Sequence, residues 1–386
     1  MPSSQLADQV VRALSPIADE TPTDVDANEI GLCLSGGGYR AMLFHVGVLW
    51  RLNELGWLTR LTRVSSVSGG SITAGVLGLN WSKLAFDGSG VATQFVANVV
   101  DPLRKMADTS IDVSSVIAGA LLPGVSISDR VTRKYKEVLF GDATLQALPD
   151  EPRFTFCATN VQTASLFRLS KKRAADWQVG ELVAPTIPLA RAVAASSAFP
   201  PVLSPCEIEL PSPLQPFADS TLGRPPFTTD LVLADGGVYD NLGIEPVWKN
   251  CGTVLVSDAG QKIDPEEEPA QDWARHTMRV LNLIDNQVRA LRKRQVVGSY
   301  VVGLRKGAYW GIRTNIQDYQ LATALPCPFD RTLDIAATPT RLTSLDAPTQ
   351  ERLINWGYAV CDAGMRAHVV TDSAVAPQFP YARGVG

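Results

Sequence analysis

A serine in a tight turn is the best candidate for a nucleophile in this sequence. It belongs to the run Ser66-Val67-Ser68-Gly69-Gly70, which ends an expected strand (63–67) and precedes a helical pattern (71–79). A nucleophile elbow reads G-x-S-x-G and lies between a strand and a helix, where the serine hydroxyl stands free. Here Ser66 replaces the first glycine with another short side chain. Because such a run alone is ordinary turn chemistry, its place between strand and helix is what favours Ser68 as the nucleophile of an acyl transfer.

A glycine-rich loop offers the second group that acyl transfer needs, a set of free N–H donors. The run Ser35-Gly36-Gly37-Gly38-Tyr39 follows an apolar segment (30–34) and precedes a helical pattern (41–55). Glycines allow positive φ and expose backbone N–H groups, which can stabilise an oxyanion. The run is also close to the dinucleotide fingerprint, which requires an acidic residue at the tip of the second strand. That tip is Val67-Ser68-Gly69, so an oxyanion loop is the better interpretation.

Asp235 is the best-placed base for this serine. It ends the apolar segment 231–234 and is followed by Gly236-Gly237, which gives it a strand-end position like that of Ser68. A carboxylate with a pKa near ~4 is a weak base for a hydroxyl. Burial between apolar side chains would raise that pKa and strengthen the base. Taken alone, Asp-Gly-Gly is more often a simple turn.

Histidine is the commonest base for a serine nucleophile, so the three histidines define the main alternative. His45 lies on the helical segment 41–55, away from the turn, and His276 and His368 lie on later helical patterns without flanking glycines. Ser68, Asp235 and either of the later histidines still follow the chain order of the α/β-hydrolase triad. A Ser-His-Asp hydrolase therefore stays open beside the Ser-Asp pair.

The elements around these runs alternate as strand, helix, strand and helix over residues 30–80. Such a βαβ unit predicts parallel strands, and ligands bind beyond the carboxyl ends of parallel strands. Further strands are expected over residues 153–160, 166–170 and 253–256, and helices over residues 189–197, 279–295 and from 346 onward. The expected fold is a three-layer α/β/α arrangement around a mostly parallel central sheet.

Two further segments bear on lipid contact. In the helix expected over 279–295, Leu281, Ile284, Val288 and Leu291 recur at helical spacing and are expected to form the buried face. The other face carries Arg289, Arg292, Lys293 and Arg294, which would be solvated or would meet anionic lipid heads. The apolar, poorly periodic segment 113–125 is either core or a flap over an apolar site.

Composition excludes several classes of protein. Of the 386 residues, 45% are hydrophobic and 19% are charged, which is typical of a globular chain. The net charge of −4 and the lack of a long basic run before residue 289 argue against nucleic acid as a partner.

The six cysteines have no metal-ligand spacing and are expected to be reduced and buried, as in a cytoplasmic protein. Residues 1–29 have no apolar signal core. The longest near-apolar run, 116–125, is too short to span a bilayer, so any membrane contact is expected to be peripheral.

Four of these runs together resemble the patatin-like phospholipases. They are Leu34-Ser35-Gly36-Gly37-Gly38-Tyr39-Arg40-Ala41-Met42, the Ser68 elbow, Ala195-Ser196-Ser197-Ala198-Phe199-Pro200-Pro201 and Asp235-Gly236-Gly237. The Ser-Gly-Gly-Gly-x-Arg-Ala-Met form, with Gly69 directly after the serine, is especially similar to the group IV cytosolic phospholipases. The matches come in the family's order and span residues 30–247, and Ser66 is the one departure.

The resemblance implies a lipid acyl hydrolase with a Ser-Asp dyad. Ser68 would attack an acyl ester and Asp235 would take its proton. The N–H groups of Gly37 and Gly38 would hold the oxyanion, with Gly36 shaping the loop. Arg40 would contact the phosphate head group, or else form a structural ion pair.

The resemblance further implies a phospholipid or lysophospholipid substrate, and the residues themselves imply neither a metal nor a cofactor. It divides the chain into an N-terminal extension (1–28), a patatin-like acyl hydrolase domain (29–250) and a C-terminal part (251–386) that completes the fold with added helices. Two alternatives are kept: an esterase or thioesterase with a histidine triad, and a non-catalytic lipid-binding or regulatory module on the same fold.

Overall fold

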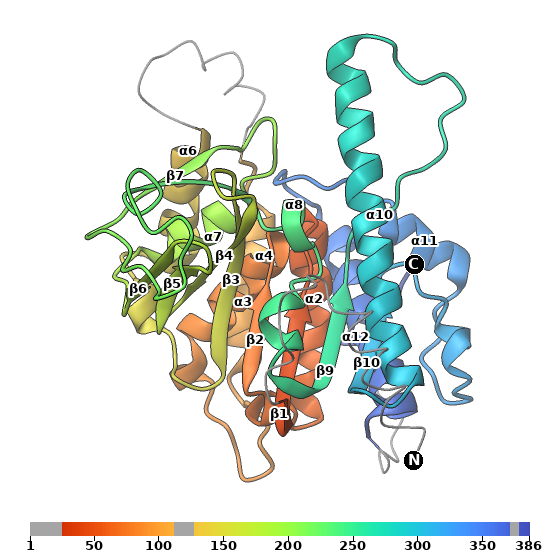
Figure 1. Cartoon of the computed structure of the whole chain (residues 1–386). Coiled ribbons are helices and arrows are strands. Elements are labelled where there is room, and N and C mark those ends of the chain that lie inside the picture. The colour runs from red at the N-terminus through yellow and green to blue at the C-terminus, as the bar shows by residue number, and fades with distance from the viewer. Residues whose placement is uncertain (1–24, 112–126, 371–377) are drawn as a thin grey trace, which may run out of the picture.

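A computed structural model describes residues 25–111, 127–370 and 378–386 of the chain (Figure 1). The expected core or flap segment 113–125 lies outside these ranges. The strands are β1 (Asp26–Leu34), β2 (Arg63–Ser66), β3 (Arg153–Asn160), β4 (Ser165–Ser170), β5 (Arg173–Asp176), β6 (Gly180–Val183), β7 (Cys206–Glu209), β8 (Asp230–Asp235), β9 (Cys251–Asp258) and β10 (Lys306–Gly311). The α-helices are α2 (Gly38–Glu54), α3 (Gly69–Leu79), α4 (Asp101–Ala107), α6 (Ile127–Tyr135), α7 (Leu189–Ser196), α8 (Gly237–Asp240), α9 (Glu245–Trp248), α10 (Trp273–Val301), α11 (Phe329–Ala336) and α12 (Ala347–His368).

The described strands form one ten-stranded sheet whose central part is parallel. Strands β10, β9, β1, β2 and β3 are parallel neighbours in that order, and β4, β5 and β6 extend the sheet in antiparallel fashion. The run β1, α2, β2, α3 is the strand–helix–strand–helix unit that the periodicity predicted. Strands β9 and β10, which follow residue 250, join the sheet at the other edge of β1.

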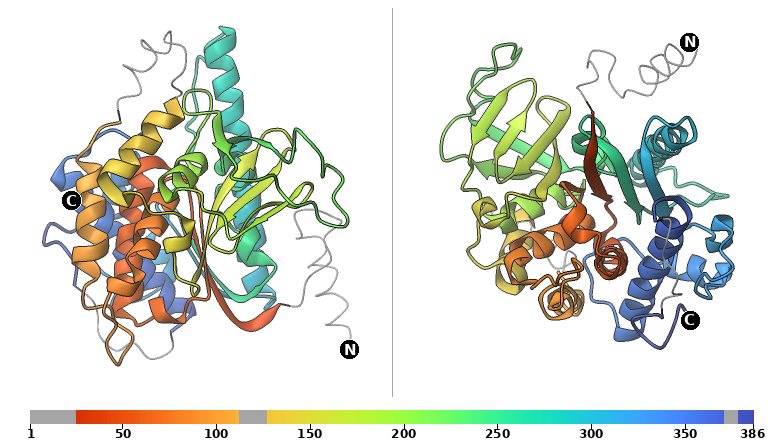
Figure 2. Two further views of the ribbon diagram at one scale, coloured as in Figure 1. Left: turned by 90° about the vertical axis from the view of Figure 1, so that its left-hand side faces the viewer. Right: turned by 90° about the horizontal axis from the view of Figure 1, so that it is seen from below.

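Helices cover both faces of this sheet (Figure 2). Because side chains alternate along a strand, Leu32 and Leu34 of β1 pack in the core that α2, α3 and α12 cover. Cys33, between them, packs on the opposite face with Trp248 of α9 and Val296 of α10. The three-layer α/β/α fold around a mostly parallel central sheet is therefore confirmed.

Strand β8 runs against its neighbour, and this direction determines where its last residue lies. Strand β4 pairs with one edge of β3 along residues 155–160, so β2 and β8 share the other edge. Strand β2 is the parallel neighbour of the first half, with Ser66 opposite Phe156. Strand β8 is the antiparallel neighbour of the second half, with Asp235 opposite Ala158. The carboxyl ends of β2 and β8 therefore meet end to end.

Helix α10 is longer than expected and is turned the other way. Leu281, Ile284 and Leu291, which were predicted to be buried, are 45%, 55% and 57% exposed. Of the charged face, Arg289 and Arg292 pack on the body instead, whereas Lys293 and Arg294 are exposed. Nη2 of Arg292 lies 2.8 Å from Oε1 of Glu245. Because a buried carboxylate needs a partner, acidic groups on the body draw the cationic face inward. The prediction of a buried apolar face was wrong for this reason.

Two smaller expectations can also be compared with the structure. All six cysteines are buried and unpaired, as the sequence predicted. None of the helices in the described ranges combines the length and the hydropathy needed to cross a bilayer.

Helices α2 and α12 pack at backbone distance through two glycines. A Cβ on Gly47 of α2 would lie 1.9 Å from the carbonyl oxygen of Ile354. A Cβ on Gly357 of α12 would lie 1.9 Å from the carbonyl oxygen of Phe44. Since α2 begins at the end of the glycine loop, this packing fixes the helix into which the loop leads.

The substitution Gly47→Ala should lower the free energy of unfolding by about 1–3 kcal/mol, because overpacking forces the two backbones apart. Urea denaturation measures the change. The control is Gly298→Ala in α10, where an added Cβ meets nothing within 4 Å. The control should leave stability unchanged or raise it by up to about 1 kcal/mol, the helix-propensity gain. Equal losses in the two variants would contradict the close packing of α2 on α12.

Candidate active site

Ser68 occupies the turn between β2 and α3, directly before the first helical residue. Its φ of 51° and ψ of −119° form a combination that residues with a side chain rarely adopt. A strained serine between a strand and a helix is the geometry of a nucleophile elbow. The N–H of Ser68 donates to the carbonyl oxygen of Ser196 at 3.1 Å and to the Ser196 hydroxyl at 3.0 Å.

Glycines beside Ser68 let the glycine loop approach the elbow closely. A Cβ on Gly69 would lie 2.2 Å from the carbonyl oxygen of Gly38, so the two segments meet at backbone distance. Gly70 is buried in the first turn of α3. The structure therefore brings the elbow and the glycine loop together, as their positions after neighbouring strands predicted.

Three buried hydroxyl groups lie beneath the elbow. The Ser71 hydroxyl is 3.0 Å from that of Ser66 and 2.8 Å from that of Ser196. Ser66 and Ser196 in turn donate to the carbonyl oxygens of Thr155 and Cys157 on β3, at 3.3 Å and 2.7 Å. This cluster ties α3 and α7 to the sheet. Ser66 fits the elbow in place of glycine because its hydroxyl is satisfied within the cluster.

The end of α7 also holds the strand that carries Asp235. The N–H of Gly236 donates at 3.3 Å to the carbonyl oxygen of Ser196, the atom that also accepts the N–H of Ser68. The N–H of Asp235 donates to the carbonyl oxygen of Ala198 at 2.8 Å. Residue patterns gave Ser196 and Ala198 no role, and the family resemblance of the run 195–201 was the only signal that marked them.

The Asp235 carboxyl is buried next to the Ser68 hydroxyl. Asp235 is 2% exposed, and its Oδ1 accepts the N–H of Gly237 at 2.7 Å. Burial raises its pKa from the ordinary 3.8 to about 7, although hydrogen bonds from the Gly237 N–H and the Ser68 hydroxyl act to lower it. The negative charge of Asp285 raises this pKa further. A carboxyl that titrates near neutral pH can both take up and return a proton.

The glycine loop provides two N–H groups without protein partners. Gly37 and Gly38 have φ values of 140° and 60°. Among the described residues, neither N–H donates to a protein acceptor. The N–H of Gly36 donates to the carbonyl oxygen of Asn241 at 3.2 Å, so this glycine shapes the loop and is not a free donor. Because Gly38 begins α2, the free donors also lie at the positive end of a helix dipole.

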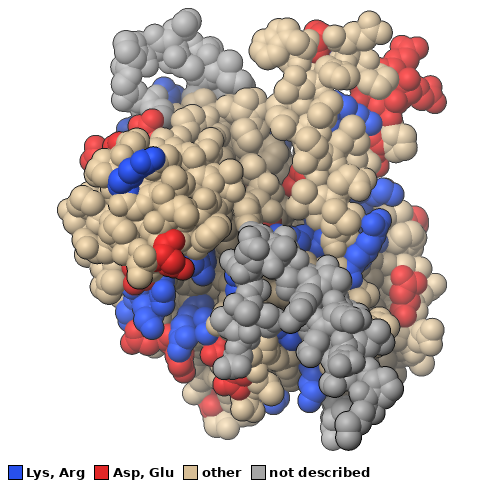
Figure 3. Space-filling model, viewed as in Figure 1, with Lys and Arg blue, Asp and Glu red and all other residues tan. Residues whose placement is uncertain are grey.

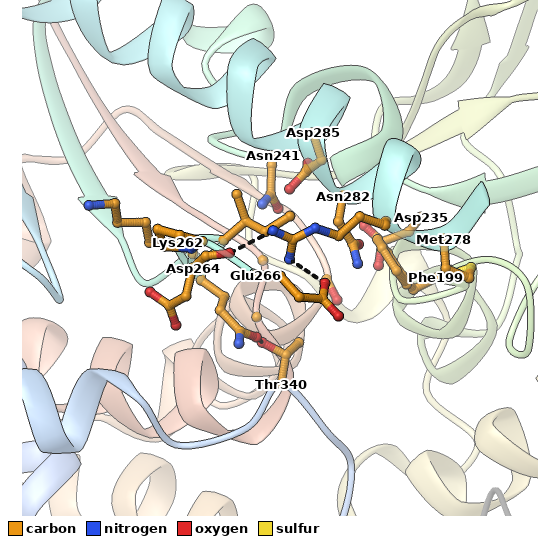
Figure 4. Close-up of a pocket in the computed structure, with 18 residues that line it drawn as sticks. Phe199, Asp235, Asn241, Lys262, Asp264, Glu266, Met278, Asn282, Asp285 and Thr340 are labelled. Atoms are coloured by element: carbon orange, nitrogen blue, oxygen red, sulfur yellow. Dashed lines mark hydrogen bonds and ion pairs between the residues drawn. The ribbon is translucent and has the colours of Figure 1, made fainter. Parts of the chain in front are cut away.

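A cavity of about 590 Å³ opens beside these groups (Figure 4). Gly36, Gly37, Ser68 and Asp235 line it together with residues 260–266 and part of α10. Arg279 of α10 joins these two outer segments. Its Nη1 lies 3.2 Å from Oε2 of Glu266, and its Nη2 donates to the carbonyl oxygen of Asp264 at 2.8 Å.

Arg40 lies outside this cavity. It is fully buried, and its guanidinium donates to the carbonyl oxygens of Ala259, at 2.9 Å and 3.2 Å, and of Thr338, at 2.6 Å. Burial, followed by the charges of Arg289 and Arg313, lowers its pKa to about 10. Arg40 thus joins α2 to the segments after β9 and α11. This setting differs from the expected head-group contact, and its partners are carbonyl groups rather than the expected ion pair.

The histidines do not complete a triad with Ser68. The ring Nε2 of buried His45 lies 2.9 Å from the carbonyl oxygen of Ser35, and burial lowers the pKa of this histidine to about 4. His276 is exposed on α10, and His368 lines a different cavity. Since these are all the histidines of the chain, the geometry disfavours the triad alternative.

The fold and the elbow are of the kind that serine hydrolases use. Residues 32–248, more than half of the chain, match the model of the patatin-like phospholipase family, and the chain belongs to that family. Members of this family are typically serine hydrolases that act on lipids.

A human and a bacterial protein are among the solved structures that are similar to this chain. Human GIVD cytosolic phospholipase A2 is 13% identical, with a TM-score of 0.51, and the match covers 95% of this chain and 63% of the human chain. VipD from Legionella pneumophila is 16% identical, with a TM-score of 0.37, and the match covers 94% of this chain and 73% of that one. The first likeness supports the fold. No curated protein matches the chain.

The raised pKa of Asp235 predicts that this carboxyl destabilises the folded chain at neutral and alkaline pH. Between pH 3.8 and about 7 the folded chain binds the proton that the unfolded chain has released, so stability falls as pH rises through this window. Asp235→Asn removes the effect and retains an oxygen for the Gly237 N–H. It should raise the free energy of unfolding at pH ~8 by a few kcal/mol, roughly 1.4 kcal/mol for each pH unit between the two pKa values. Near pH ~4 the gain should vanish.

Thermal melting at the two pH values measures this difference. The control is Asp230→Asn at the exposed start of the same strand, which should change stability little. An Asp235→Asn variant that is no more stable than the wild type at the higher pH would contradict the buried, proton-retaining carboxyl.

Proposed function

We propose that this chain hydrolyses carboxylic esters of phospholipids or lysophospholipids, with Ser68 as nucleophile and Asp235 as base. One observation carries the proposal: Ser68, in its strained turn, lines the same cavity as Asp235 and lies close enough to affect the pKa of that carboxyl, which burial raises to about 7. A base is most effective when its pKa lies near the working pH. The buried setting therefore supplies what an ordinary carboxylate lacks as the partner of a hydroxyl.

In the first half of the reaction, Oγ of Ser68 bonds to the ester carbonyl carbon while its proton passes to Asp235. The N–H groups of Gly37 and Gly38 stabilise the negative carbonyl oxygen that develops. The bond to the alcohol part then breaks, and the leaving oxygen takes the proton from Asp235. The acyl group remains as an ester on Ser68.

In the second half, water takes the place of the alcohol. The water oxygen bonds to the acyl carbon while Asp235 accepts a proton from the water. The N–H groups of Gly37 and Gly38 again stabilise the oxyanion. The bond to Ser68 breaks, Asp235 returns the proton to Oγ, and the fatty acid leaves. No group outside the chain and the water is needed for this sequence of steps.

The cavity supports a lipid acyl chain as the bound group. Its volume of about 590 Å³ is within the range of ligand pockets. Phe199, Ile263 and Met278 add apolar surface to the polar groups around Ser68. Arg40, which is buried elsewhere, takes no part in this proposal.

Neither alternative gains support from the site. A histidine triad requires a histidine beside Ser68, and the three rings lie elsewhere. A non-catalytic lipid-binding module would not need a strained serine or a buried carboxyl with a raised pKa, each of which costs stability. A labelled fluorophosphonate separates a catalytic serine from a binding module.

Ser68→Ala and Asp235→Asn should each lower kcat for hydrolysis of a water-soluble short-chain ester by at least about a thousandfold. The two groups act as one unit, so the double variant should be within a few-fold of either single variant. His276→Gln and His368→Gln are the controls and should retain activity. Losses that multiply in the double variant would argue against the dyad, and a folded histidine variant that loses more than about a hundredfold would favour the triad.

The pH profile of kcat/KM should follow Asp235. Because the carboxylate is the active form, kcat/KM should rise about tenfold per pH unit below pH ~7 and level off above it. Asp285→Asn should move the midpoint to lower pH, since the charge of Asp285 raises the pKa of Asp235. A profile that is flat between pH ~5 and pH ~8 would remove Asp235 from the role of base.

A further inference from the structure

Helix α10 presents several exposed apolar side chains to solvent on one face. Trp273 at its first position is 83% exposed, and Val280, Leu281, Ile284 and Leu291 are between 40% and 57% exposed. These five residues, the outer stripe of α10, recur at helical spacing and share one face. Apolar residues gathered on one face of a helix mark a docking surface when nothing in the described chain covers them.

The opposite face of the same helix is part of the cavity. Met278, Arg279, Asn282 and Asp285 of α10 line it, together with Ser68 and Asp235. Figure 4 shows Met278, Asn282 and Asp285 directed toward the cavity. The outer stripe is therefore separated from the cavity by the thickness of one helix. The N-terminal end of α10, where the stripe begins, projects beyond the rest of the body (Figure 1).

The charges around the outer stripe indicate what kind of surface it meets. Asp285 is the only acid on α10, and it faces the cavity. The basic side chains at the N-terminal end of the helix are paired, Arg275 with Asp272 and Arg279 with Glu266. The segment before the helix is strongly acidic and exposed, and it brings acidic side chains beside the projecting end of α10 (Figure 3). Its acids are Asp264, Glu266, Glu267, Glu268 and Asp272. An apolar stripe with an acidic rim fits a surface without net negative charge.

We propose that the outer stripe of α10 docks on an uncharged or zwitterionic phospholipid surface. The choice of a lipid surface rests on the proposed function, because a hydrolase of membrane lipids must take its substrate from such a surface. A helix with one apolar face lies in the plane of a membrane interface. Tryptophan, the most exposed residue of the stripe, is enriched at that depth.

The size of the stripe favours lipid over a second copy of the chain. Five side chains, roughly half exposed, offer on the order of a few hundred Å² of apolar surface. A specific dimer takes roughly 800 Å² from each partner. Insertion into lipid requires no matching surface and can use a narrow stripe.

Vesicle co-sedimentation of the full chain tests the proposal. All variants carry Ser68→Ala, so that the lipid is not consumed. The test pair Leu281→Gln and Ile284→Gln should weaken partitioning onto phosphatidylcholine vesicles by about tenfold or more, since two apolar side chains leave the interface. The control pair Val161→Gln and Val183→Gln changes residues that are 56% and 65% exposed elsewhere. It should alter partitioning by no more than about twofold.

Vesicle charge provides a second readout. Added phosphatidylglycerol should weaken partitioning at low salt, because the acidic segment is repelled, and added salt should reduce the difference. Stronger partitioning onto anionic vesicles than onto phosphatidylcholine vesicles would overturn the proposal, because it would show that basic residues make the membrane contact. Equal partitioning of the test and control pairs would also overturn it.

Two further measurements separate a lipid-docking stripe from a dimer interface and from a failure of the proposed function. If ultracentrifugation shows a dimer that the test pair dissociates, and vesicles bind neither form, the stripe meets a second copy and the proposal fails. The active chain is assayed separately on a water-soluble short-chain ester. Vesicle binding as expected without ester cleavage would contradict the proposed function and support the surface. Ester cleavage without vesicle binding would support the proposed function and contradict the docking surface.

Discussion

The site depends on the carbonyl oxygens at the end of α7. Strands β2 and β8 share one edge of β3 and end against each other, so backbone N–H groups beyond their ends have no strand partner. The carbonyl oxygens in the last turn of a helix have no partner within the helix, so they can accept these N–H groups. Ser196 accepts N–H groups from Ser68 and Gly236, and Ala198 accepts the N–H of Asp235. One helix end thereby holds both strand ends and keeps the serine hydroxyl against the carboxyl.

Two features of this arrangement lower the stability of the fold. Ser68 adopts a backbone conformation that is unfavourable for a residue with a side chain. Asp235 is a nearly fully buried carboxyl, and no cationic group is among those that shift its pKa. The surrounding structure makes both sustainable: the hydroxyl cluster satisfies the polar groups under the elbow, and the close packing of α2 on α12 fixes the helix behind the glycine loop. Strain and unfavourable burial at such a point are typical of sites at which stability has been exchanged for reactivity.

The sequence predicts the local parts of this site well, because each is a short signal in the chain. Expected strands that lead into Ser35, Ser68 and Asp235 identify the strand ends, and the glycines after these residues identify the turns. It does not predict that β8 runs antiparallel, because a strand has the same residue pattern in either direction. The role of Ser196 was also hidden, because its partner Ser68 lies 128 positions away. Four strands, β5, β6, β7 and β10, were not expected; they have four to six residues each and give weak patterns.

The settings of α10 and of Arg40 could not be predicted from periodicity and residue type alone. Periodicity shows which residues of α10 share a face, but the carboxylates on the body, Glu245 among them, decide which face turns inward. Arg40 likewise looks like a ligand for a phosphate group until the carbonyl oxygens of Ala259 and Thr338 are known to surround it. The measurement that tests the central claim most directly is peptide mapping of the chain after reaction with a labelled fluorophosphonate. The account predicts a single adduct on Ser68 in the wild type and a much slower reaction in Asp235→Asn. An adduct on another serine, or labelling of Ser68 at the same rate without the carboxyl, would contradict it.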